Sequence, residues 1–151
     1  MHLTYVSVGP TGAINLRPPL FARLGDVLAE WVAGHPATEP IPEIGVGADD
    51  LVLPRHSGLS PTHGTETFKV LRNLGVRTII IAGISVNIAI PVVATEAVDE
   101  DFDVVIATDA VAGDPPEYVA FMMQHTLAFI ARLSTVDELL AEWDVSAVAR
   151  P

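Results

Sequence analysis

Apolar and polar residues follow one another along the chain in a pattern that predicts alternating strands and helices. Residues 2–8, rich in β-branched and aromatic side chains, predict a first strand, and the apolar spacing over residues 20–32 predicts a helix. Further strands are expected over residues 50–54, 76–82, 103–107 and 132–134, and further helices over residues 64–74, 87–100, 115–131 and 135–143. This order predicts an α/β fold, a three-layer parallel sheet flanked by helices.

Composition and length favour one soluble domain over residues 1–151. Half of the residues are hydrophobic, yet no apolar run approaches the roughly 20 residues of a membrane-spanning helix. The N-terminus also lacks the basic and apolar segments of a signal peptide. We therefore expect a cytoplasmic protein that covers apolar surface by forming a homo-oligomer, a dimer or larger.

Charge and residue content exclude several kinds of partner. The chain has 8 basic and 19 acidic residues, and a net charge of −11 repels nucleic acid and anionic membrane surfaces. The absence of cysteine excludes disulfides and thiol catalysis. His56 and His63 flank a loop of Gly, Ser and Pro without the spacing of a metal site, and Gly45-Val46-Gly47 is no dinucleotide signature, so neither metal nor cofactor is expected.

The segment Gly83-Ile84-Ser85-Val86-Asn87-Ile88-Ala89-Ile90 is the strongest candidate for a site. It follows the apolar run of residues 78–82 and leads into a predicted helix, so it should lie at the carboxyl edge of the sheet, where open α/β proteins bind ligands. Ser85 loosely resembles the serine of a nucleophile elbow, although Asn87 replaces its second glycine. The alternative is that Ser85 and Asn87 shape this turn and cap the following helix.

This segment and its neighbours resemble the isochorismatase-like, or cysteine hydrolase, superfamily. The region that matches best is residues 49–143, after a variable region at residues 9–48. The matching motifs, in order, are Asp50-Leu51-Val52-Leu53-Pro54-Arg55, Gly64-Thr65 with Leu71-Arg72-Asn73-Leu74-Gly75-Val76-Arg77-Thr78, the segment from Gly83, Asp103-Val104-Val105-Ile106-Ala107-Thr108-Asp109-Ala110-Val111-Ala112, and Leu133-Ser134-Thr135-Val136-Asp137-Glu138-Leu139.

The resemblance implies a catalytic triad that this chain lacks. In the family an aspartate carries a proton, a lysine stabilises charge and a cysteine thiolate attacks an amide or imide carbonyl. The resemblance places Arg55 at the lysine position and Ala89 at the cysteine position, and the strand bearing the aspartate has no counterpart. Arginine cannot donate a proton near neutral pH, but it can hold an anion bidentately.

The same resemblance implies a sheet of order 3-2-1-4-5-6 from which the first, central strand is missing. Three explanations remain open. The chain is a shortened version of a longer protein, which we favour; or it pairs its own flanking strands directly; or a partner subunit fills the position.

The resemblance also implies a pocket formed at the turn. The backbone N–H groups of Ser85 and Ala89 would form an oxyanion hole beside Ile84, with a cis peptide bond between Ile84 and Ser85 and with Arg55 nearby. We therefore expect a pseudoenzyme that retains a pocket for a small carboxylate or amide.

Two other functions remain open. One is an active hydrolase of C–N or ether bonds that uses Ser85 with a histidine of the loop from His56 to His63. The other is a structural subunit that pairs with an intact homologue. Outside this region, Phe121, Met122, Met123 and Phe129 are expected to form a buried helix face, with His125 packed in a core or interface.

Overall fold

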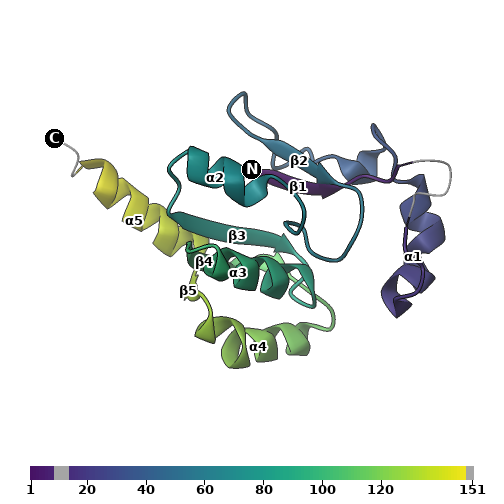
Figure 1. Ribbon diagram of the computed structural model, residues 1–151. Coiled ribbons are helices and arrows are strands. Elements are labelled where there is room, and N and C mark those ends of the chain that lie inside the picture. Colours follow the sequence, from purple (N-terminus) through teal and green to yellow (C-terminus); the bar gives the residue numbers. More distant parts are fainter. Residues whose placement is uncertain (9–13, 149–151) are drawn as a thin grey trace. The chain divides into compact units, whose positions relative to one another are not determined.

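The computed structural model describes residues 1–8 and 14–148, and for residues 144–148 it describes the backbone alone. The chain divides into two compact units, residues 1–67 and residues 68–151. Hydrogen bonds group the five strands of the described residues into two parallel sheets, one within each unit (Figure 1). Each unit is described in turn.

The first unit is built around two paired strands. β1 (His2–Tyr5) and β2 (Val52–Arg55) pair in parallel, with Tyr5 beside Arg55 in the register. The helix α1 (Pro19–Glu30) and the short 3-10 helix η1 (Pro36–Thr38) lie between them in sequence. The predicted first strand is too long, because regular pairing ends at Tyr5. Ser7 forms only an isolated bridge, and its N–H donates to the Trp31 carbonyl over 2.7 Å.

The second unit carries a three-stranded parallel sheet of order β3-β4-β5. The helix α2 (Thr67–Asn73) starts at the last residue of the first unit. The elements that follow it are β3 (Thr78–Ile84), α3 (Ala89–Asp99), β4 (Asp103–Ala112), α4 (Pro116–His125), the 3-10 helix η2 (Leu127–Phe129), β5 (Arg132–Ser134) and α5 (Val136–Val148). The predicted α/β class and the parallel pairing are confirmed.

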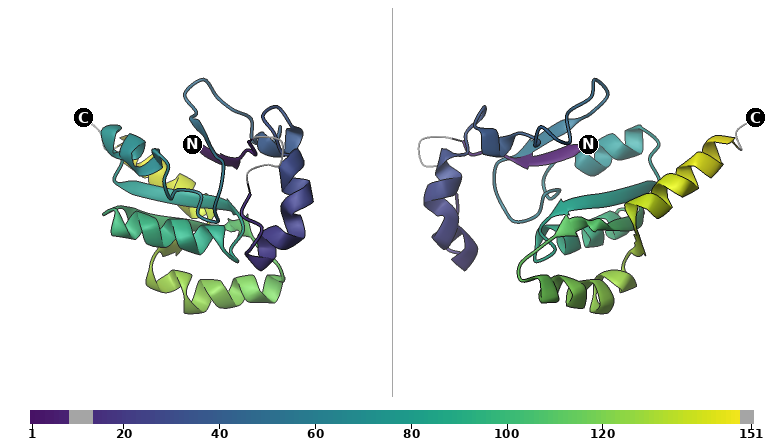
Figure 2. Two further views of the ribbon diagram at one scale, coloured as in Figure 1. Left: turned by 45° about the vertical axis from the view of Figure 1, so that its right-hand side comes forward. Right: turned by 180° about the vertical axis from the view of Figure 1, so that it is seen from behind.

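Alternating side chains of β4 divide the core of the second unit into two layers of contacts. Val104 and Ile106 pack with α3 and α4, whereas Val105 and Ala107 pack with Leu139 of α5. Figure 2 shows α3 and α4 on one side of this sheet and α5 on the other. The second unit is therefore a sheet between two helical layers, because successive residues of a strand point to opposite faces.

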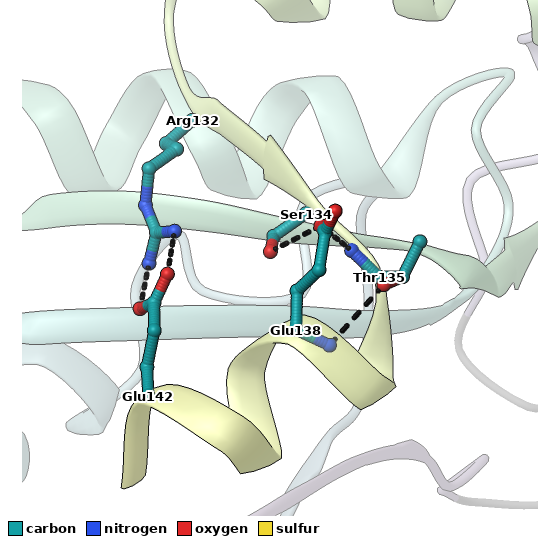
Figure 3. Close-up of polar contacts among 5 residues, drawn as sticks. All are labelled: Arg132, Ser134, Thr135, Glu138 and Glu142. Carbon is teal, nitrogen blue, oxygen red and sulfur yellow. Dashed lines mark hydrogen bonds and ion pairs between the residues drawn. The ribbon is translucent and has the colours of Figure 1, made fainter. Parts of the chain in front are cut away.

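The start of α5 is fixed by the capping box that the sequence predicts (Figure 3). The Glu138 carboxylate accepts hydrogen bonds from the Thr135 N–H over 2.9 Å and from the Ser134 hydroxyl over 3.0 Å, and the Glu138 N–H donates to Thr135 Oγ1 over 3.3 Å. The two bonds that the carboxylate accepts, above all the one from the Thr135 N–H, lower the pKa of Glu138. Further along α5, Glu142 accepts two hydrogen bonds from Arg132 over 2.7 and 2.9 Å.

The expectation of a buried face around α4 is wrong in part. Met122 and Met123 pack against the core, but Phe121 is 58% exposed and Phe129 is 82% exposed. His125 is also exposed, so it lies outside the core, and its place in an interface stays a prediction. The stripe that touches the core runs through Val119, Met122 and Met123, and Phe121 lies off that stripe. The helix also stops at His125, earlier than predicted, because the backbone leaves helical geometry at Thr126.

Candidate functional site

The turn between β3 and α3 has the form that the sequence predicts for a site. β3 ends at Ile84 after Gly83, whose φ of +112° is the left-handed backbone that favours glycine. The peptide bond between Ile84 and Ser85 is cis, as the resemblance implies. Val86 then turns its side chain fully into the core, and its N–H donates to the Ala112 carbonyl over 2.9 Å. The turn is thus anchored to the end of β4.

The backbone donors of this turn lie at the start of α3. The Ser85 carbonyl accepts the N–H groups of Ile88, over 3.3 Å, and Ile90, over 3.0 Å. Among the described residues, neither the Ser85 nor the Ala89 N–H donates to a backbone carbonyl. The Ala89 N–H stands at the first position of α3, where an unpaired N–H carries partial positive charge and attracts an anion or a carbonyl oxygen. Ala89, which the resemblance places at the position of the family's thiol, offers only a methyl group.

Asn87 braces the site instead of facing a ligand. Its Nδ2 donates to the Asp114 carbonyl over 2.6 Å, and its Oδ1 accepts the Asp114 N–H over 3.0 Å. A Cβ at Gly113 would lie 2.5 Å from that Oδ1, so glycine is needed for the close approach. The N-cap of α3 is Ile88 without a side-chain cap, so neither Ser85 nor Asn87 caps this helix, and that part of the alternative interpretation is wrong.

The remaining predicted residues lie in the first unit. The Arg55 guanidinium carbon is 5.0 Å from the centroid of the Tyr5 ring, and its Nη1 donates to the carbonyls of Ser57, over 3.4 Å, and Gly58. Burial lowers the pKa of Arg55, and Tyr5 counteracts part of that effect. His56 Nδ1 lies 2.8 Å from the Val6 carbonyl oxygen. Since a carbonyl only accepts, that nitrogen carries a proton.

The loop from His56 to His63 is held by its own polar groups. The N–H groups of Thr62 and His63 both donate to Ser60 Oγ, over 3.1 and 2.8 Å. These bonds form a local turn typical of serine side chains. The role of His56 and His63 as catalytic partners of Ser85 therefore stays a prediction.

The structure brings together Ile84, Ser85, Asn87 and Ala89 in the second unit, and Arg55 with His56 in the first. Ile84 is 79% exposed, so its side chain points to solvent. Within the described residues of the second unit, the Ser85 hydroxyl has no hydrogen-bond partner. The pocket that would join Arg55 to Ser85 and Ala89 stays a prediction.

Two sites were not predicted from the sequence. Tyr5, the aromatic neighbour of Arg55, was missed, although parallel pairing of the two predicted strands could have placed them side by side. A depression at the amino ends of the second sheet was also missed. It is lined by Thr78, Val98, Phe102, Asp103, Val104, Val105, Ala128, Phe129, Ile130, Ala131 and Arg132.

Over residues 1–8 and 14–148, no group of three or more histidine, aspartate or glutamate side chains has the arrangement of a metal site. Across the same residues, none of the helices combines the length and apolar character needed to cross a bilayer.

Comparison with known proteins gives a consistent family. The family model of the isochorismatase domain matches residues 19–138. The uncharacterized isochorismatase family protein YecD of Escherichia coli O157:H7 is 36% identical over 78 residues, which are 52% of this chain and 42% of that protein. The chain thus spans less than half the length of this relative. YwoC of Bacillus subtilis, described in the same words, is 27% identical over 135 residues, 87% of this chain and 68% of YwoC.

A solved structure shows the same fold. The isochorismatase-like hydrolase from Alkaliphilus metalliredigens has a TM-score of 0.75 with 20% sequence identity, and the match covers 94% of this chain and 70% of that one. The parallel α/β architecture agrees with this likeness. Because the family model matches most of its length, the chain belongs to the isochorismatase domain family.

Proposed function

We propose that this family member binds a small amide or carboxylate at the turn between β3 and α3 without hydrolysing it. One observation carries the proposal: the backbone N–H groups of Ser85 and Ala89 donate to no backbone carbonyl among the described residues, in a chain that has no cysteine. The turn has kept groups that bind a carbonyl oxygen but has no thiolate to attack the carbonyl carbon.

The chemistry of the remaining side chains supports a binding role. N–H donors aimed at one oxygen stabilise a ground-state carbonyl or carboxylate as well as an oxyanion. Hydrolysis additionally needs a nucleophile and a proton carrier in reach of one another. Asn87 is occupied by Asp114, and the Ser85 hydroxyl has no base hydrogen bonded to it within the described second unit. The arrangement therefore favours reversible binding.

The proposal is tested by titrating the ¹⁵N-labelled chain with benzamide while the backbone amide signals are followed by NMR. We expect saturable shifts of the Ser85 and Ala89 signals. An Ala89→Val variant should weaken binding about fivefold or more, because two added methyl groups crowd the donors. Ala120→Val, which adds the same bulk at an exposed position of α4, is the matched control and should not change binding. Unmoved Ser85 and Ala89 signals would overturn the proposal.

A further inference from the structure

The pairing of β1 with β2 places a guanidinium on an aromatic ring at the carboxyl end of both strands. Tyr5 and Arg55 are register partners of a parallel ladder, so their side chains leave the same face of the sheet. The Val6 N–H donates to the Arg55 carbonyl over 2.9 Å, which fixes the backbone at this point. The guanidinium carbon then lies 5.0 Å from the centre of the Tyr5 ring. This distance is typical of a cation–π contact.

Arg55 differs from two other arginines of the chain in its partners. Arg132 and Arg72 each pair with a carboxylate, Glu142 and Glu100 respectively. Among the described residues, Arg55 has no carboxylate partner, and its hydrogen bonds to them all leave from Nη1. The Nε–Nη2 edge of the guanidinium is therefore without an acceptor there. That edge presents two parallel N–H groups, the geometry that a carboxylate accepts.

We propose that Arg55, held over the Tyr5 ring and tied at Nη1 to its own loop, binds the carboxylate group of a small monocarboxylate through its Nε–Nη2 edge. The inference rests on the proposed function in one respect, the small-molecule ligand. Within the first unit, the guanidinium would favour a charged acid over a neutral amide.

The charge of the site argues for a monoanion. One guanidinium neutralises one negative charge, and the chain as a whole carries a net charge of −11, which repels a dianion such as phosphate. Arg55 is partly buried, and burial lowers its pKa, yet arginine stays protonated at every physiological pH. A partly desolvated charge binds its counter-ion more strongly than a fully hydrated one.

The Tyr5 hydroxyl does not take part. Its oxygen is buried without a hydrogen-bond partner among the described residues, so a ligand cannot reach it. The ring is the useful part of Tyr5, because it holds the guanidinium plane in one orientation. Tyr5→Phe should therefore keep binding within about twofold, whereas Tyr5→Leu, which removes the aromatic face, should weaken it several-fold.

The test is a titration of the full chain with benzoate, with benzamide and inorganic phosphate as comparison probes. Binding is followed at the side-chain Nε–H signal of Arg55 in ¹⁵N NMR spectra. We expect benzoate to shift this signal and Arg55→Gln to weaken benzoate binding about tenfold or more, the usual loss for a charge-assisted pair. Arg55→Lys keeps the positive charge but not the two parallel N–H donors, so it should lose part of the affinity for benzoate. Arg23→Gln removes an exposed arginine of the same unit and should change nothing.

The outcomes separate this inference from the proposed function. Benzoate binding that is unchanged in Arg55→Gln, or phosphate binding as tight as benzoate, overturns the carboxylate site. Benzamide should bind Arg55→Gln as it binds the original chain, because it has no charge to pair. If benzamide fails to move the Ser85 and Ala89 signals while benzoate still moves the Arg55 signal, the proposed function falls and the Arg55 site stands.

Discussion

The two units of the chain bury apolar surface to very different extents. In the second unit, Ile106 and Leu127 are fully buried, and one continuous core joins the sheet to α3 and α4. Among the described residues, Phe21 and Leu28 are the buried apolar side chains of the first unit, and both units also expose large apolar side chains. Most of the packing that stabilises the chain therefore lies in the second unit.

This difference bears on the two candidate sites. The turn with Ser85 and Ala89 stands on the packed unit, where the neighbouring Val86 is fully buried. Arg55 stands on a two-stranded sheet, which has little stability of its own. Rigid donors suit recognition of a carbonyl oxygen. A side chain on a more weakly packed element depends on local contacts, here the Tyr5 ring and the Gly58 carbonyl.

The largest effect is expected from a cavity in the packed unit. Ile106→Ala removes a fully buried side chain from the centre of β4 and should lower the free energy of unfolding by about 3–5 kcal/mol. Leu28→Ala in the first unit should cost about 2 kcal/mol, because a loosely packed site can collapse around the change. Urea unfolding followed by circular dichroism measures both. A larger loss for Leu28→Ala than for Ile106→Ala would contradict the claim that most of the stabilising packing lies in the second unit.

A smaller effect is expected at the turn itself. Asn87→Ala removes both hydrogen bonds to Asp114 and should lower the free energy of unfolding by about 2 kcal/mol. Asn73→Ala, at the exposed end of α2, is the control and should change it by about 0.5 kcal/mol or less. The same unfolding assay applies. An equal change in the two variants would mean that Asn87 does not brace the turn.

The pH dependence of stability should report the start of α5. Because the pKa of Glu138 is lower in the folded chain than its usual value near 4.5, its carboxylate stabilises the fold above that value. The contribution is lost as the pH falls through the lower, folded pKa. The free energy of unfolding should therefore fall less steeply with decreasing pH in Glu138→Gln than in the original chain. Glu117→Gln removes an exposed carboxylate of α4 as a control, and an equally flat curve for it would contradict this assignment.

The smallest effect is expected from the exposed pair of Arg132 and Glu142. Both side chains are about half exposed, so solvent screens the attraction, and a double-mutant cycle with Arg132→Gln and Glu142→Gln should give a coupling of about 0.5 kcal/mol. Denaturant unfolding of the original chain, the two single variants and the double variant measures this coupling energy. A coupling above about 2 kcal/mol would show that the second unit depends on this surface pair as much as on its core.

Much of the fold could be predicted from the sequence where local signals were strong. The apolar run of β3 and the capping box at Thr135 and Glu138 specify their elements within a few residues. The end of α4 could not be predicted in this way, because no proline or glycine marks Thr126. The exposure of Phe129 was missed for a related reason. Which apolar side chains a helix buries depends on its orientation over the sheet, which periodicity alone leaves open.

The candidate site was predictable only in part. Sequence placed Ser85, Asn87 and Ala89 on one turn, since they are close along the chain. It could not show that Asn87 is committed to Asp114, because that contact spans 27 residues. The contact of Tyr5 with Arg55 spans 50 residues and depends on strand register, which a sequence pattern alone does not define.

The most direct test of the central claim is ammonia release from benzamide by the purified chain, at a concentration that saturates the Ser85 and Ala89 amide signals. The absence of a thiol predicts binding with no ammonia above the uncatalysed rate. Turnover that is lost in Ser85→Ala would contradict the account and would identify an active hydrolase with a serine nucleophile.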